Sequence, residues 1–97
     1  IGEQVDRFVS TLETDYAEAL AAKRRENFEL IARQAHRLHG QAKFVGDAPL
    51  ASACQRLEAS AAAGSAADCQ SGLTEVAREI GRLTAALHRA QPAEMSG

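Results

Sequence analysis

The residues best suited to chemistry lie in one short stretch of the chain, from Ala35 to Gly46. In this stretch and just before it, apolar residues recur at steps of three and four, which is the spacing of an amphipathic helix. The apolar stripe consists of Leu30, Ile31, Ala35, Leu38, Ala42 and Val45. The same spacing collects Arg33, His36, Gly40 and Lys43 on another face. We therefore expect His36 to point outward, as a potential nucleophile among cations.

Gly40 lies one turn beyond His36 on the same face of this helix. A glycine inside a helix costs roughly 1 kcal/mol relative to alanine, so its presence there calls for a reason. The missing side chain would let another molecule approach the imidazole closely. The cations Arg33, Arg37 and Lys43 would suit an anion at that place. On residue type alone, an ordinary polar surface histidine remains the alternative.

This stretch resembles the histidine-containing phosphotransfer (HPt) domains of bacterial multistep phosphorelays. Their usual pattern is His, any residue, Leu, Lys, Gly, then small residues, an apolar residue and Gly. The matching residues are His36, Leu38, Gly40, Val45 and Gly46, followed in the next predicted helix by Leu50, Cys54, Leu57 and Glu58. The resemblance runs from Asn27 to the late eighties. Two residues depart from the pattern, because His39 stands where the family commonly has lysine and Gln41 replaces a usual serine.

The resemblance implies a phosphorelay intermediate. His36 would accept a phosphoryl group from the aspartate of a receiver domain and pass it to the aspartate of a response-regulator receiver. Glu58 would hold the far ring nitrogen of the histidine and fix its tautomer. The residues expected to stabilise the phosphoryl group, or to give access to it, are Arg37, His39, Gly40, Lys43 and Glu58.

The resemblance also implies the partners and the setting. Receiver domains would dock on apolar residues of the first helix and around the site, with the local cations giving complementary charge. The receiver would contribute Mg²⁺ and the acidic pocket, so no cofactor or metal of this chain is expected. The domain would then be a substrate of the relay more than an autonomous enzyme. The expected context is the C-terminal domain of a bacterial hybrid sensor histidine kinase, located in the cytoplasm, with an inner-membrane sensor kinase as the candidate parent.

Length and composition limit the other classes. Ninety-seven residues suit one small domain with a single core, expected to span residues 1–97. Eleven Lys and Arg against thirteen Asp and Glu give a net charge of −2, which argues against a nucleic-acid binder. Alanine is abundant and β-branched residues are sparse, which favours an all-α fold. No apolar run near 18 residues and no signal-peptide pattern occurs, so no membrane span is expected.

The periodicity predicts four amphipathic helices. They are expected at about residues 3–22, 27–45, 48–62 and 66–90, followed by a tail at 91–97. The charged residues of the first helix, including Asp15, are expected mostly away from its apolar side. Helices joined by such short turns can bury their stripes only by packing together, and an antiparallel up-down-up-down four-helix bundle is the simplest arrangement.

Particular residues mark the expected helix ends and the expected core. The predicted stops and caps are Asn27, Gly46, Asp47, Gly64 and Ser65. Cys54 and Cys69 lack CxxC spacing and fall on apolar stripes, so buried free thiols are favoured over a disulfide. Gly72 and Gly81 are expected where the last helix packs closely against a neighbour.

Two other functional classes remain as alternatives. A helical bundle could bind a metal ion through His36 and His39, although these are three apart and no Glu-x-x-His pair occurs. A purely structural interaction module of the same fold, inactive in phosphotransfer, is the second alternative. A metal titration tests the first, and incubation with a phosphorylated receiver tests the second.

Overall fold

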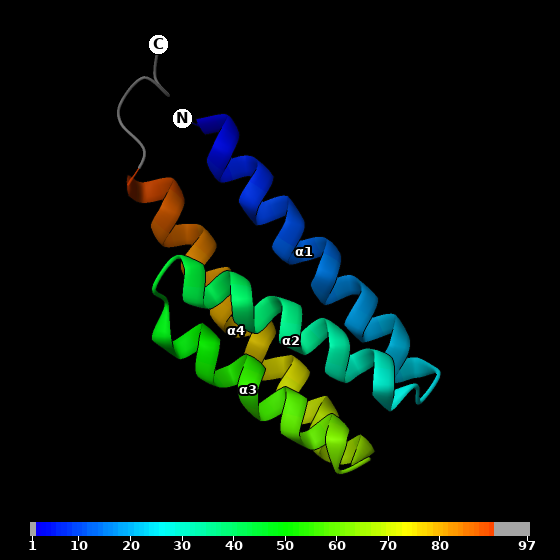
Figure 1. The fold of residues 1–97 in the computed structure, drawn as a ribbon. Helices are drawn as coiled ribbons and strands as arrows, with labels where there is room; N and C mark the ends of the chain where they lie inside the picture. The colour runs from blue at the N-terminus through cyan, green and yellow to red at the C-terminus, as the bar shows by residue number, and fades with distance from the viewer. Residues whose placement is uncertain (1, 91–97) are drawn as a thin grey trace.

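The structure, a computed structural model, describes residues 2–90 and forms four α-helices in this range (Figure 1). They are α1 (Gly2–Arg24), α2 (Phe28–Phe44), α3 (Ala48–Ala62) and α4 (Ala66–Ala90). Each helix packs against the next, and α4 packs back against α1. The predicted antiparallel four-helix bundle is therefore confirmed. The first helix continues to Arg24, two residues beyond the expected end, and the predicted tail at 91–97 lies outside the described residues.

The three turns between helices share one hydrogen-bond pattern. In the turn after α2, the Gly46 N–H donates to the Lys43 carbonyl at 3.1 Å and the Asp47 N–H donates to the Ala42 carbonyl at 2.9 Å. This pair of bonds is the Schellman motif, which requires a left-handed residue just past the helix. That residue is Gly46 (φ 74°) here, Gly64 (φ 69°) after α3 and Glu26 (φ 54°) after α1.

The residue after each left-handed position also caps the next helix. Asn27 and Asp47 accept hydrogen bonds from N–H groups three residues on, at 3.1 and 2.9 Å, and the Ser65 hydroxyl does the same at 3.2 Å. The predicted caps are thus confirmed. Because one residue closes a helix and its neighbour opens the next, the connections are short and successive helices must run antiparallel.

The core is built from the apolar stripes, with three corrections to the sequence predictions. Val45 was expected inside but is 40% exposed, because it follows the last residue of α2 and no longer lies on the stripe. Asp15 was expected on the outer side of the first helix but is only 3% exposed. Gly81 was expected at a packing contact, but a Cβ added there would meet nothing within 4 Å.

The cysteine prediction is confirmed, because Cys54 and Cys69 are free and buried. Burial raises the pKa of the Cys54 thiol to about 12 and also raises the pKa of Cys69. Few thiolates form at neutral pH under these conditions, so both residues act as small apolar side chains of the core.

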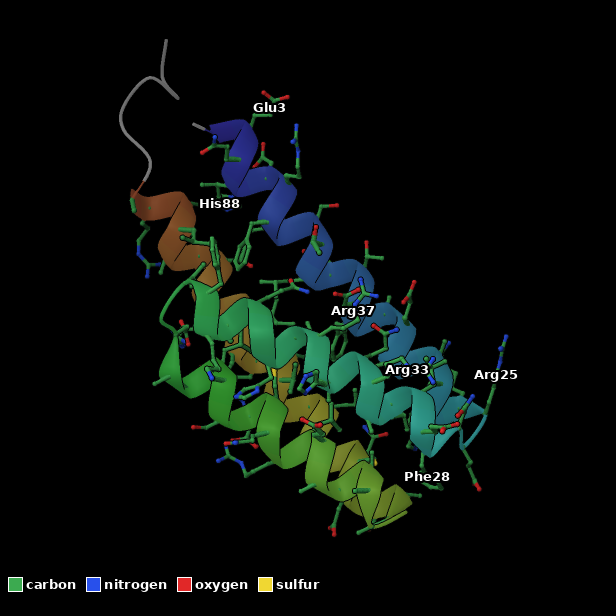
Figure 2. All side chains as sticks on the ribbon, viewed as in Figure 1. Glu3, Arg25, Phe28, Arg33, Arg37 and His88 are labelled. Atoms are coloured by element: carbon green, nitrogen blue, oxygen red, sulfur yellow. The ribbon has the colours of Figure 1, made fainter. Side chains whose placement is uncertain are left out.

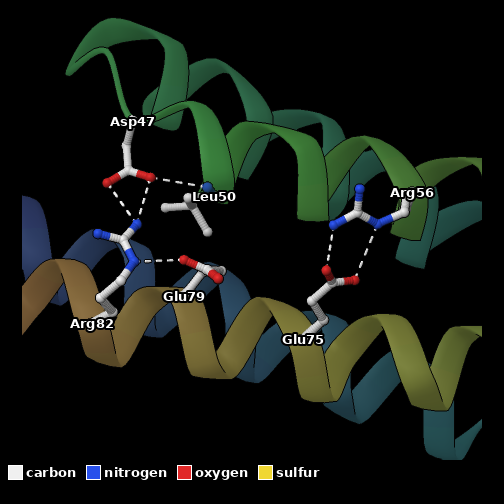
Figure 3. Close-up of polar contacts among 6 residues, drawn as sticks. All are labelled: Asp47, Leu50, Arg56, Glu75, Glu79 and Arg82. Carbon is white, nitrogen blue, oxygen red and sulfur yellow. Dashed lines mark hydrogen bonds and ion pairs between the residues drawn. The ribbon is translucent and has the colours of Figure 1, made fainter.

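Ion pairs join α3 to α4 across the bundle surface (Figure 3). Asp47 caps α3 through the Leu50 N–H, and both its oxygens accept from the Arg82 Nη2 nitrogen of α4, at 2.7 and 2.8 Å. Further along, Arg56 of α3 donates two hydrogen bonds to the Glu75 carboxylate of α4. These contacts hold α3 in place from its first turn onward. They therefore also fix the position of Glu58, which α3 carries.

We expect the Asp47 contacts to make stability depend on pH. Burial alone would raise the pKa of the Asp47 carboxyl, but hydrogen bonds from Arg82 and the Leu50 N–H, with the Arg82 charge, lower it below its ordinary value. A lowered carboxyl pKa contributes stability above the unfolded value, near pH 4, and loses it as the pH falls through the folded pKa. Asp47→Asn, which keeps a capping oxygen, should therefore be less stable than wild type by about 1 kcal/mol at pH 7, and the difference should shrink as the pH falls below about 4 through the lowered pKa.

Urea unfolding between pH 2 and 7 measures this difference. The matched control is Asp68→Asn, which removes an exposed carboxylate from the first turn of α4. Its difference from wild type should be smaller at pH 7. A gap for Asp47→Asn that stays constant over the whole range would show that the Arg82 pair adds nothing beyond the cap.

Candidate functional site

The candidate site lies on the outer face of α2, at its edge with α3. The His36 side chain is 73% exposed, and its Nδ1 atom lies 3.4 Å from Oε2 of Glu58 on α3. Glu58 follows Leu57, which is fully buried, so the packing of α3 turns the carboxylate toward this edge. With Nδ1 facing the carboxylate, Nε2 is the ring nitrogen available to another molecule.

Gly40 and Lys43 flank His36 on the same face. At about 100° per residue, Lys43 lies roughly 20° from His36 around the helix and Gly40 roughly 40° on its other side. A Cβ added at Gly40 would meet nothing within 4 Å, so the helix surface beside the imidazole is open. Lys43 is exposed and forms no ion pair among residues 2–90.

The other two sequence-predicted residues point to different edges of α2. His39 is half-buried and lies about 60° from His36 around the helix, on the side away from Arg37. Arg37 lies on the side nearer α1, where its Nε atom is 3.7 Å from Oδ2 of the buried Asp15 (Figure 2). The structure therefore brings His36 and Glu58 together beside the open surface at Gly40, with Lys43 about two turns along the same face, and it sets Arg37 apart from Glu58 on the opposite edge.

A surface groove adjoins the candidate site on the α1 side. It has a volume of about 580 Å³. Its lining residues are Gln4, Arg7, Phe8 and Thr11 of α1 and Arg37, Gly40, Gln41 and Phe44 of α2. Phe44 is 86% exposed, an unusual state for a large apolar side chain. A molecule that approaches His36 over Gly40 would also meet this groove.

The sequence predictions missed two features near the site, the exposed Phe44 and the buried Asp15. The exposure of Phe44 could have been predicted, because this residue lies outside the apolar stripe, about 80° from His36 around the helix. The burial of Asp15 could also have been predicted, because Asp15 lies three residues after Leu12 and four before Ala19, both of which are fully buried. A carboxylate at such a stripe position indicates a buried charge that needs a partner on another helix.

No metal centre or membrane span is found in the part of the chain that the structure describes. Within residues 2–90, no three His, Cys, Asp or Glu side chains converge so that they could hold a metal ion. None of the four helices in this range is both long and apolar enough to cross a membrane.

The structure thus presents an exposed histidine beside an open glycine on the surface of a four-helix bundle. The Hpt domain family matches residues 3–91, and the chain belongs to this family. Membership implies histidine phosphotransfer in a phosphorelay, with receiver domains as partners. Comparison with curated proteins and with solved structures finds no match.

Gly40 and Gly72 should respond in opposite directions to the same substitution. Gly40→Ala should raise the free energy of unfolding by about 1 kcal/mol, because alanine is the better helix former and its Cβ meets nothing there. At Gly72, the predicted close contact is real, since a Cβ would lie 3.1 Å from Leu57 Cδ1 and 3.3 Å from Leu57 Cα. Gly72→Ala should therefore lower stability by about 1 kcal/mol.

Chemical denaturation of the two variants measures both changes. A loss of stability in Gly40→Ala would identify Gly40 as a packing residue and remove the argument that its missing side chain serves access to His36.

Proposed function

We propose that His36 accepts a phosphoryl group from the phosphoaspartate of a receiver domain and passes it to the aspartate of a response-regulator receiver. The observation that supports this most directly is the exposed imidazole with Nδ1 3.4 Å from the Glu58 carboxylate. A proton on Nδ1 facing Glu58 leaves the lone pair of Nε2 directed outward, which is the form needed for nucleophilic attack.

In the proposed reaction, Nε2 attacks the phosphorus atom of the phosphoaspartate. A nitrogen–phosphorus bond forms while the phosphorus–oxygen bond to the aspartate breaks, and the aspartate leaves as a carboxylate. The ring keeps its Nδ1 proton and becomes positively charged, so the negative Glu58 carboxylate stabilises the product. Transfer to the second receiver reverses these steps and restores the neutral ring. Because the proton stays on Nδ1, this chain needs no general base.

The neighbouring residues have supporting roles in this proposal. Lys43 lies about two turns beyond His36 on the same face and forms no ion pair within residues 2–90, and its long side chain would direct positive charge toward the phosphoryl oxygens. His39 adds charge when protonated, and Arg37 contributes positive charge on the groove side. Gly40 leaves space for the receiver, which supplies Mg²⁺ and the acidic pocket in which the phosphoaspartate forms.

The setting is also part of the proposal. We infer a single domain over residues 1–97 that belongs to a bacterial hybrid sensor histidine kinase, as its C-terminal phosphotransfer domain on the cytoplasmic side. This context rests on the resemblance in sequence. In such a protein the domain receives the phosphoryl group from the kinase's own receiver and passes it to a separate response regulator.

His36→Gln should abolish phosphoryl acceptance while leaving the fold intact, since an exposed side chain contributes little to the core. The measurement is transfer of radiolabelled phosphoryl groups from receiver domains charged with acetyl phosphate and Mg²⁺, with circular dichroism as the check on folding. Acid-labile label on the variant would show that His36 is not the acceptor. His39 would then be the next candidate, and His39→Gln should abolish the labelling. No label on the wild-type domain from any receiver tested would favour an inactive interaction module.

Glu58→Gln should retain acceptance but slow it about tenfold, which corresponds to about 1.4 kcal/mol of transition-state stabilisation. Glutamine keeps an oxygen that can face Nδ1–H, but it lacks the charge that stabilises the cationic ring. The matched control is Glu13→Gln on the exposed side of α1, which changes the net charge equally. Equal single-turnover rates for Glu58→Gln and wild type would leave Glu58 with a solubility role alone.

A further inference from the structure

Asp15 is a buried carboxylate at the interface of α1 and α2. It is 3% exposed and accepts a hydrogen bond from the Gln41 side-chain nitrogen at 2.6 Å. Its Oδ2 atom also lies 3.7 Å from Nε of Arg37. A buried charge is costly unless it is paired, so Asp15 requires polar partners. Gln41 and Arg37 of α2 supply them, and their contacts with Asp15 in turn restrict both side chains.

The consequence for Arg37 is a fixed direction. Its side chain is 59% exposed, and its Nη nitrogens form no hydrogen bond or ion pair among the described residues. The Nε atom thus lies within ion-pair distance of a buried carboxylate, and Arg37 lines the groove with its Nη donors unpaired among residues 2–90. An arginine offers such donors in a rigid planar fork that matches a carboxylate.

The groove itself favours an acidic partner. Its lining contains Arg7 and Arg37 and no carboxylate, because Asp15 lies beneath Arg37 and is not part of the lining. The two arginines differ in how well their carboxylate partners restrict them. Arg7 pairs with Glu3 at 3.6 Å, where both side chains are more than three-quarters exposed, and such exposed pairs restrict a side chain weakly. Arg37 is thus the better-oriented cation next to Gly40.

We propose that Asp15 is a positioning residue for phosphotransfer: with Gln41, it holds the Arg37 guanidinium in the wall of the groove, where it pairs with a carboxylate on the docking surface of the receiver domain. This inference rests on the proposed function of His36. Arg37 acts on recognition, because it lies on the α1 edge of α2, away from Glu58. Asp15 touches neither the receiver nor the phosphoryl group and acts through Arg37.

The physical effect is a smaller entropy loss on docking. A free arginine side chain must give up rotamer freedom when it pairs, whereas one already held at Nε has lost part of that freedom on folding. Removing the anchor should therefore weaken binding of the receiver between about twofold and tenfold, and it should leave the chemical step nearly as it was.

The test compares Asp15→Asn, Arg37→Ala and the double variant with wild type. Asparagine retains an oxygen for the Gln41 amide but carries no charge for Arg37, so the variant should fold. The partner is whichever isolated receiver binds the wild-type domain most tightly by titration calorimetry, and it is charged with acetyl phosphate and Mg²⁺ for the transfer assay. The measurements are KM and kcat for transfer, and Kd for the uncharged receiver by titration calorimetry. Arg78→Ala, on α4, removes the same unit of charge from a helix that does not pack against α2.

We expect Asp15→Asn to raise KM and Kd between about twofold and tenfold with kcat changed less than twofold. Arg37→Ala should raise both at least as much, Arg78→Ala should not, and Asp15→Asn should add nothing in the Arg37→Ala background. Unchanged Kd and KM in Asp15→Asn would overturn the inference. It would also be overturned if Asp15→Asn raised Kd and KM as much in the Arg37→Ala background as in wild type, because Asp15 would then act without Arg37, as a purely structural carboxylate. Failure of the wild-type domain to accept label while Kd still responds to Asp15→Asn would instead refute the function proposed for His36 and retain the docking role.

Discussion

The burial of one face of α2 is the constraint on which the site depends. Ile31, Ala35, Leu38 and Ala42 are fully buried, and each large apolar side chain removed from water contributes about 1.5–3 kcal/mol. Because the helix has a fixed period, burying this face fixes the direction of every other residue on α2. His36 then points outward, roughly opposite the core, and the core therefore sets the orientation of the site.

The same constraint gives α2 two edges with different neighbours. The edge toward α3 brings Glu58 to Nδ1 of His36, and the edge toward α1 brings Asp15 to Arg37 and Gln41. The His36 ring therefore has its carboxylate neighbour on α3, whereas the groove on the other side of α2 is lined by residues of α1. A substitution on α1 can alter the groove without touching the environment of the imidazole, so under the function proposed here partner recognition and nucleophile chemistry would vary separately.

The turns and surface contacts keep these edges in register. Asp47 is the clearest case, because it closes the turn after α2, caps α3 and pairs with Arg82 of α4. Glu58 lies three turns further along α3, so any rotation of α3 would move its carboxylate away from His36. Gly72 lets α4 pack closely against Leu57, the residue immediately before Glu58. The contact at the site therefore depends on packing on the far side of α3.

The sequence by itself determined the parts of this protein that local rules govern. Helix periodicity placed His36 outside and Cys54 inside, and the left-handed preference of glycine placed the stops at Gly46 and Gly64. The pattern around His36 also indicated the family. Each of these follows from residues within one or two turns of one another, where spacing alone fixes the geometry.

Only the tertiary structure decided what happens between helices. Asp15 is buried because α1 packs against α2 at that point, and Arg37 turns toward it for the same reason. Gly72 meets Leu57 whereas Gly81 meets nothing, although both are glycines of one helix. The approach of Glu58 to His36 likewise requires the relative rotation of α2 and α3. Periodicity identifies the buried face of a helix, but the partner of each edge residue is set by how neighbouring helices pack, which no local pattern contains.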